Sequence, residues 1–185
     1  MEFNIGLVYG TESGNTEDVA KKIKQRMEAL GCQVELFDIQ DQDADAFVNY
    51  DFLIMGIPTW EYGGIQDDWE NFEQDLLQLD LHNKVIALFG LGDQYGYGDW
   101  YLDAMGWLHE RLLKCGAQMI GYWPTTGYEF DESRACLDDN NKFCGLALDE
   151  DCQRELTDER LDKWIQQIIA EFNDKSAEKL AANAG

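Results

Sequence analysis

A short apolar run leads directly into a loop of small polar residues in IGLVYGTESGNT, residues 5–16. The apolar part, Ile5 to Tyr9, has the length and composition of a buried strand. Residues 11–16 are rich in hydroxyl and amide side chains, and an amphipathic helical pattern begins near Glu17. Backbone N–H groups at a helix start are unpaired and lie at the positive end of the helix dipole. The stretch therefore predicts a strand, an anion-binding loop and a helix, in that order.

The loop contains no lysine or arginine, so neutral groups must bind any phosphate held there. A nucleoside triphosphate loop would place Lys after its last glycine, but Asn15 follows Gly14. The glycine pattern of dinucleotide-binding folds is also missing, because Gly90 and Gly92 have no third glycine at the required spacing. A single terminal phosphate fits best, and an ordinary polar helix cap is the alternative.

Composition narrows the classes of protein to consider. A chain of 185 residues is long enough for one domain with a sizeable core. Its 37 acidic and 14 basic residues leave a formal net charge of -23, which argues against nucleic acid and anionic membranes and favours basic partners. Five cysteines without a Cys-x-x-Cys pair indicate reduced thiols, with no disulfide framework or metal site. With no signal peptide and no membrane-spanning run, we expect a cytoplasmic protein.

Apolar runs recur along the chain at intervals long enough for a helical crossover. Four of them are residues 3–9, 34–37, 52–57 and 85–89. Two later runs, Met119 to Trp123 and Phe143 to Leu148, are separated by a polar segment, so an insertion interrupts the last strand. The pattern predicts an α/β fold with a doubly wound, five-stranded parallel sheet.

Apolar residues at helical spacing lie between these strands. They span Val19 to Leu30, Trp69 to Leu79, Tyr101 to Leu112 and Leu161 to Phe172. We expect Thr157 to cap the last helix, and Trp69, Trp107 and Trp164 to face the core. Residues 1–173 are expected to form a single domain, and residues 174–185 a frayed tail.

Aromatic, glycine-rich loops follow the third and fourth strands, at residues 58–64 and 90–99. In doubly wound sheets the carboxyl ends of the strands form the ligand crevice. Loops bury little, so the rings of these loops indicate a planar ligand held by stacking; they are Trp60, Tyr62, Tyr95 and Tyr97. A protein interface is the alternative use of such rings.

Taken together, the motifs resemble those of the flavodoxins, in particular the long-chain bacterial type, over nearly the whole chain. They are GTESGNT at 10–16, PTW at 58–60, GDQ at 92–94, GYWPT at 121–125 and GLALDE at 145–150. The resemblance implies a flavodoxin-like sheet of strand order 2-1-3-4-5, with the long-chain insertion in the fifth strand. It also implies noncovalently bound FMN in a single domain of residues 1–173.

The resemblance assigns roles to individual residues. It places Trp60 on the inner face of the isoalloxazine and Tyr97 on the outer face, and Gly92 with Asp93 at the pyrimidine edge. The loop of residues 11–16 would bind the phosphate. The full set expected to bind the cofactor is Thr11, Glu12, Ser13, Gly14, Asn15, Thr16, Pro58, Thr59, Trp60, Glu61, Tyr62, Gly63, Leu91, Gly92, Asp93, Tyr97 and Asp149.

The implied function is a low-potential one-electron carrier, without substrate chemistry of its own. A flavodoxin/ferredoxin-NADP reductase would be its donor and basic-faced redox enzymes its acceptors, and we expect a monomer. Acidic residues around the site would disfavour the anion of the fully reduced flavin and lower its potential. Gly63 would let the adjoining peptide turn toward flavin N5 at little cost.

Other functions remain open at this point. An FMN-dependent quinone reductase-like enzyme would need positioned acid, base or hydroxyl groups, and neither His82 nor His109 lies in a motif that suggests one. A phosphoacceptor domain would need acids where Thr11 and Pro58 stand. A non-redox interaction module is the third alternative.

The insertion carries aromatic residues, among them Tyr128 and Phe130, which we expect to pack it onto the sheet; a docking surface is the alternative. Cys136, inside the insertion, is predicted to be the most exposed and oxidisable thiol.

Overall fold

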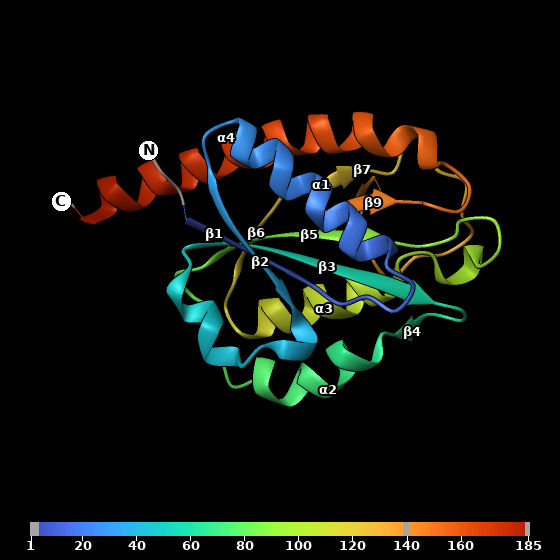
Figure 1. The fold of residues 1–185 in the computed structure, drawn as a ribbon, viewed down its shortest axis with the longest axis horizontal. Helices are drawn as coiled ribbons and strands as arrows, with labels where there is room; N and C mark the ends of the chain where they lie inside the picture. Colours follow the sequence, from blue (N-terminus) through green and yellow to red (C-terminus); the bar gives the residue numbers. More distant parts are fainter. Residues whose placement is uncertain (1–3, 139–140, 184–185) are drawn as a thin grey trace.

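Parallel strands cross the middle of the protein in the computed structural model, which describes residues 4–138 and 141–183 (Figure 1). The main strands lie in the order β2-β1-β3-β5-β6. This order is the predicted 2-1-3-4-5, so the fold class is confirmed. Phe3, where the first apolar run begins, lies outside the described residues. The bounds are β1 (Asn4–Tyr9), β2 (Gln33–Asp38), β3 (Phe52–Trp60), β5 (Val85–Leu91) and β6 (Gln118–Ile120).

The fifth strand is divided in two. β5 pairs with β6 through Val85–Ala87 and with β9 (Leu146–Leu148) through Phe89–Leu91. The chain between β6 and β9 forms the insertion, which contains a short antiparallel pair, β7 (Trp123–Pro124) and β8 (Lys142–Phe143). The interruption predicted from the two apolar runs is therefore confirmed.

Helices cover both faces of the sheet (Figure 1). α1 (Asn15–Ala29) and α4 (Thr157–Asn183) lie on one face, and α2 (Asp67–Leu76) and α3 (Asp103–Lys114) on the other. Their apolar sides and the sheet form one continuous core, which follows from burying both faces of a parallel sheet. The remaining elements are β4 (Gly64–Ile65) and the short 3-10 turns η1 (Ile39–Asp41), η2 (Ala44–Asn49), η3 (Gly98–Trp100) and η4 (Arg154–Leu156).

The predicted core residues are buried. Trp69 and Trp164 are fully enclosed, and Trp107 is 6% exposed. Trp69 Nε1 donates to the carbonyl of Gly56, and Trp164 Nε1 donates to the carbonyl of Gly121, so each indole satisfies its polar atom inside the core.

Helix ends differ from the periodic pattern at several positions. α1 ends at Ala29, so Leu30 is exposed. Thr157 is the first residue of α4, and its hydroxyl donates to the Glu150 carboxylate, so the expected cap is wrong. α4 runs through Asn183, so residues 174–183 are helical although residues 177–182 are exposed. The division of the chain at residue 173 stays a prediction.

Aromatic rings pack the insertion against Tyr101, which precedes α3, and the Tyr128 hydroxyl donates to the carbonyl of Ala147 in β9 of the sheet. Tyr101 lies 5.6 Å from Phe130 and 5.9 Å from Phe143, measured between ring centroids, and Tyr128 lies 5.3 Å from Phe143. The packing role predicted for Tyr128 and Phe130 is therefore confirmed. Among the helices described, none combines the length and apolar character that a membrane crossing requires.

Candidate functional site

The loops after β1, β3, β5 and β9 surround a cavity of about 410 Å³ at the carboxyl ends of the strands. Cavities of this size commonly hold small ligands, and this edge of a doubly wound sheet is where ligands bind. Most of the predicted site residues meet here. The lining consists of Glu12, Ser13, Asn15, Thr16, Pro58, Thr59, Trp60, Glu61, Leu91, Gly92, Asp93, Tyr97, Glu150 and Asp151.

The loop after β1 presents the start of α1 to this cavity. Gly14 precedes the helix in the left-handed conformation, with φ of 90°, and its N–H donates to Thr11 Oγ1 at 3.0 Å. Thr11 and Gly14 thus shape the loop, while the side chains of Ser13, Asn15 and Thr16 line the cavity. The N–H groups of the first helical turn have no partner within the helix, which suits an anion.

The loop after β3 is a tight hairpin between β3 and β4. Trp60 stands at its start, 37% exposed and on the cavity wall. Glu61 and Gly63 have positive φ values of 37° and 83°, which few residues other than glycine adopt readily. Thr59 Oγ1 accepts the N–H of Ala104 at 3.1 Å and so joins the end of β3 to the start of α3.

The loop after β5 supplies the opposite wall. Asp93 accepts the N–H groups of Tyr95 and Gly96 on one oxygen, at 3.1 and 2.7 Å, which turns the chain back toward Tyr97. Tyr97 is half-buried and lines the cavity. Tyr62 lies outside the lining and contacts Tyr97 edge-on at 5.7 Å. Trp60 and Tyr97 therefore bring two rings from separate loops to one cavity, as predicted.

Asp149 lies outside the lining and is fully buried. One of its oxygens accepts the backbone and side-chain N–H groups of Gln94 at 3.0 and 2.8 Å. The other accepts the N–H groups of Asp151 and Cys152 at 3.1 and 2.8 Å. The carboxylate therefore joins the loop after β5 to the loop after β9. A buried acid needs this number of donors, because an unpaired charge would be costly there.

Glu150 and Asp151 line the cavity, although the sequence analysis did not single them out. Their signal was the acidic run that follows the apolar strand of residues 146–148, at the same sheet edge as the other loops. Burial raises the pKa of Asp151, and the nearby carboxylates of Asp93 and Asp149 raise it further. No lysine or arginine is among the described residues of the lining, so the site is electronegative.

The most accessible thiol beside this site is Cys152. Its Sγ donates to Asp93 Oδ1 at 3.4 Å, and desolvation together with Asp149 raises its pKa to about 11. Cys136 is half-buried in the insertion, and burial raises its pKa as well. The prediction that Cys136 is the most exposed thiol is therefore wrong, because the Cys136 side chain packs against the hydrophobic core.

Comparison with known proteins agrees with the fold and the position of the cavity. Residues 7–164 match the family model described as flavodoxin. The chain belongs to the flavodoxin family. It is 45% identical to Flavodoxin 2 of Salmonella typhi over 175 residues, which cover 94% of this chain and 99% of that protein. It is 48% identical to the flavodoxin of Synechocystis sp. over 164 residues, 89% of this chain and 95% of that one.

Solved flavodoxin structures share its architecture. The Fusobacterium nucleatum flavodoxin bound to flavin mononucleotide superposes with a TM-score of 0.84 at 29% identity, covering 91% of this chain and 98% of its own. A variant of the same protein, also bound to flavin mononucleotide, gives 0.86. The sheet order described above is that of the flavodoxin fold, and the divided fifth strand is consistent with the long-chain type. The cofactor contacts of the individual site residues stay predictions.

Proposed function

We propose that this chain is a low-potential one-electron carrier that holds FMN noncovalently in the cavity at the carboxyl edge of the sheet. The observation that carries the proposal is one cavity lined by Trp60, by Tyr97 and by the first turn of α1. A flat ring system is held well between aromatic side chains, and a phosphate needs free N–H groups. The flavin mononucleotide in the Fusobacterium structures supports the same cofactor here.

The donor set of the loop fits a phosphate. N–H groups at the start of α1, the hydroxyls of Ser13 and Thr16 and the amide of Asn15 would bind it without a basic side chain. FMN, when bound, supplies one-electron redox chemistry. The acids on the cavity wall, Glu61 and Asp93 among them, make added negative charge less favourable and so lower the potential.

The same charge suggests the partners. A net charge of -23 favours proteins with basic faces, and we infer a flavodoxin/ferredoxin-NADP reductase as donor and basic-faced redox enzymes as acceptors. Nucleic acid and anionic membrane are disfavoured by the same repulsion. The five free cysteines support a reducing compartment such as the cytoplasm, where we expect the protein to act as a monomer.

The test is an anaerobic reductive titration of the FMN-loaded protein, followed in the visible spectrum. We expect a long-wavelength band that rises and then falls as electrons are added singly. Bleaching in one two-electron step would instead favour an FMN-dependent quinone reductase-like enzyme. Failure to bind FMN after reconstitution would refute both.

A matched pair of variants tests the stacking. Tyr97→Leu removes a ring from the cavity wall, and we expect FMN to bind about fivefold more weakly, since one aromatic stack contributes roughly 1 kcal/mol. Tyr95→Leu removes a ring from the same loop, but Tyr95 is exposed and bonds to Glu129, so the affinity should stay close to wild type. Equal losses in both variants would contradict the assigned role of Tyr97.

A further inference from the structure

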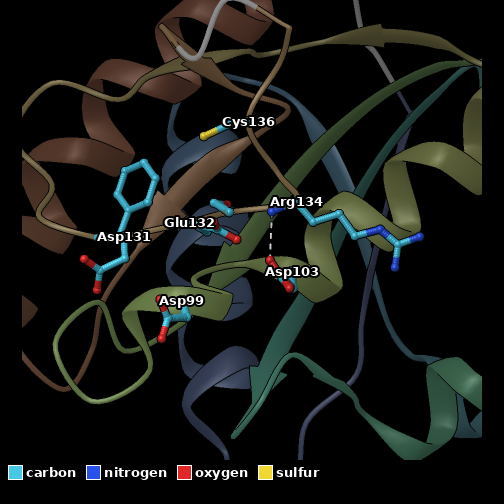
Figure 2. A pocket seen from close by; sticks show the side chains of 8 residues that line it. Asp99, Asp103, Asp131, Glu132, Arg134 and Cys136 are labelled. Atoms are coloured by element: carbon cyan, nitrogen blue, oxygen red, sulfur yellow. Dashed lines mark hydrogen bonds between the residues drawn. The ribbon is translucent and has the colours of Figure 1, made fainter.

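The start of α3 lies between the insertion and the hairpin that borders the flavin cavity. A second cavity, of about 690 Å³, opens beside it and is lined by residues of η3, α3 and the insertion (Figure 2). Asp103, the first residue of α3, and Arg134 of the insertion meet on its wall, joined by the hydrogen bond drawn in Figure 2.

The Asp103 carboxylate lies between two loops and is hydrogen-bonded to one of them. Oδ1 accepts the backbone N–H of Arg134 at 2.8 Å. Oδ2 faces the hairpin, where a methyl group added at Gly63 would lie only 3.0 Å away. This side chain of α3 is therefore hydrogen-bonded to the insertion and packs close to the hairpin turn of residues 61–63, whose Glu61 lines the flavin cavity.

That turn has an unfavourable backbone shape that its neighbours must maintain. Glu61 has a φ of 37° and Gly63 a φ of 83°. Tyr62, between them, packs edge-on against Trp100 at 5.2 Å, and Trp100 also lies beside Gly63. Leu102, directly before Asp103, has a positive φ of 60°. Such conformations persist where the surrounding structure determines them, and they gather at functional sites.

The insertion does not need Asp103 to stay attached to α3. The Arg134 guanidinium forms an ion pair with Glu110 at 2.6 Å. The absence of a side chain at Gly106 also lets the Arg134 backbone approach the helix, since a methyl group there would lie 2.4 Å from its carbonyl oxygen. The hydrogen bond between the Arg134 N–H and Asp103 is therefore an additional attachment of the insertion. It is made by the side chain that lies beside the hairpin of the flavin site.

We propose that Asp103 is a positioning residue that holds the turn of residues 61–63 in its flavin-facing shape and transmits the position of the insertion to it. The step to FMN affinity rests on the proposed function, whereas the coupling of insertion and turn belongs to the protein alone. A partner that contacts the insertion would thereby alter the wall of the flavin cavity.

The test compares Asp103→Ala, Asp103→Asn and Glu132→Gln. Asp103→Ala removes the acceptor, Asp103→Asn keeps an acceptor oxygen, and Glu132→Gln removes a charge from the same cavity without touching the turn. Amide hydrogen exchange of the apoprotein is followed at residues 60–65 and 134, and FMN affinity by flavin fluorescence. Circular dichroism checks folding, and Asp103→Leu replaces Asp103→Ala if the latter does not fold.

We expect Asp103→Ala to exchange about tenfold faster at residue 134, the effect of losing one charged hydrogen bond. Exchange at residues 60–65 should also be faster, because the turn loses the side chain that packs beside it. Its FMN affinity should fall severalfold, and its first midpoint potential should shift. Asp103→Asn and Glu132→Gln should resemble wild type in exchange and affinity. Faster exchange at residue 134 alone, or identical behaviour of Asp103→Ala and Glu132→Gln, would overturn the proposal. If wild type binds no FMN, the proposed function fails, while the exchange data still decide the coupling.

Discussion

Asp93 shows how one residue serves both the shape and the charge of the site. Its carboxylate turns the loop after β5 by accepting two backbone N–H groups, and it lines the cavity. An asparagine would keep an acceptor oxygen for those N–H groups and remove the negative charge. The fold of the loop and its electrostatics can therefore be separated by a single substitution.

We predict that Asp93→Asn raises the potential for the second electron. A negative charge on the cavity wall contributes about 1 kcal/mol to the free energy of adding an electron in a partly solvated site. This corresponds to about 40 mV for one electron. Asp68, on α2 and outside the cavity lining, should give a smaller rise as Asp68→Asn. Spectroelectrochemical titration of both variants measures this. A lower or unchanged potential in Asp93→Asn would contradict the electrostatic effect assigned to this carboxylate.

His109 is a buried histidine on α3, packed edge-on against Tyr122. Burial lowers its pKa, and the neighbouring Glu110 raises it by less. Because the folded pKa lies below the unfolded value of about 6.5, protonation favours the unfolded chain. Stability contributed by neutral His109 is thus present above about pH 6.5 and is lost as the pH falls toward the folded pKa.

We therefore expect acidification from about pH 8 to about pH 5.5 to destabilise wild type relative to His109→Gln, which cannot gain this charge. Denaturant unfolding of both proteins at the two pH values gives the difference in free energy of unfolding. The comparison between variants cancels the titration of the many carboxylates. A difference that does not change with pH would mean that His109 titrates normally in the folded protein.

At the scale of elements, α4 has two parts with different roles. The apolar side of its first half is buried, and Phe172 closes the core by stacking on Phe52 at 4.6 Å. Beyond Asn173 the side chains are mostly exposed, Leu180 by 67%. The second half is helical because good helix formers continue the pattern, although they have little to pack against.

Two truncations test this division. A chain ending at residue 173 should unfold within about 0.5 kcal/mol of the full protein, since exposed positions contribute little. A chain ending at residue 171 also loses Phe172 and should be destabilised by about 3 kcal/mol, the usual cost of removing a buried phenylalanine. Thermal and denaturant unfolding compare them. Equal stability of the two truncations would contradict the role of Phe172.

At the scale of the whole molecule, the net charge of -23 dominates encounters with partners. A field of this kind speeds association with basic proteins and is screened over about 8 Å at physiological ionic strength. Because the cavity wall is acidic too, the field extends to the redox site. Weak, fast complexes are the expected result.

We predict that electron transfer from a flavodoxin/ferredoxin-NADP reductase slows about tenfold between roughly 0.01 and 0.3 M ionic strength. Stopped-flow kinetics with the two purified proteins measures the rate. Reduction of the same protein by an uncharged small reductant is the control and should change little. Rates that do not depend on salt would exclude electrostatic steering.

Local sequence patterns were sufficient for the architecture and for the loops of the site. A strand buried on both faces of a parallel sheet is visible in the sequence as an apolar run. In residues 11–16 the polar donors and the start of the helix lie within a few positions of each other. The division of the fifth strand was predictable because its two parts are separate apolar runs. Trp60 and Tyr97 could be assigned to one cavity because parallel strands bring their carboxyl ends to one edge.

Contacts between distant segments could not be read in this way, because they depend on which side chains meet once the loops fold. Asp149 is a buried acceptor for two loops, and it supports the cavity wall through the Asp151 N–H without lining the cavity itself. The contacts of Asp103 with Arg134 and with the Gly63 turn join residues far apart in the chain. Cys136 is half-buried for the same reason, because the insertion packs against α3 where Gly106 lies close to Arg134 and Ala135. Periodicity encodes an element and its inner face, whereas pairing across loops exists only in the assembled protein.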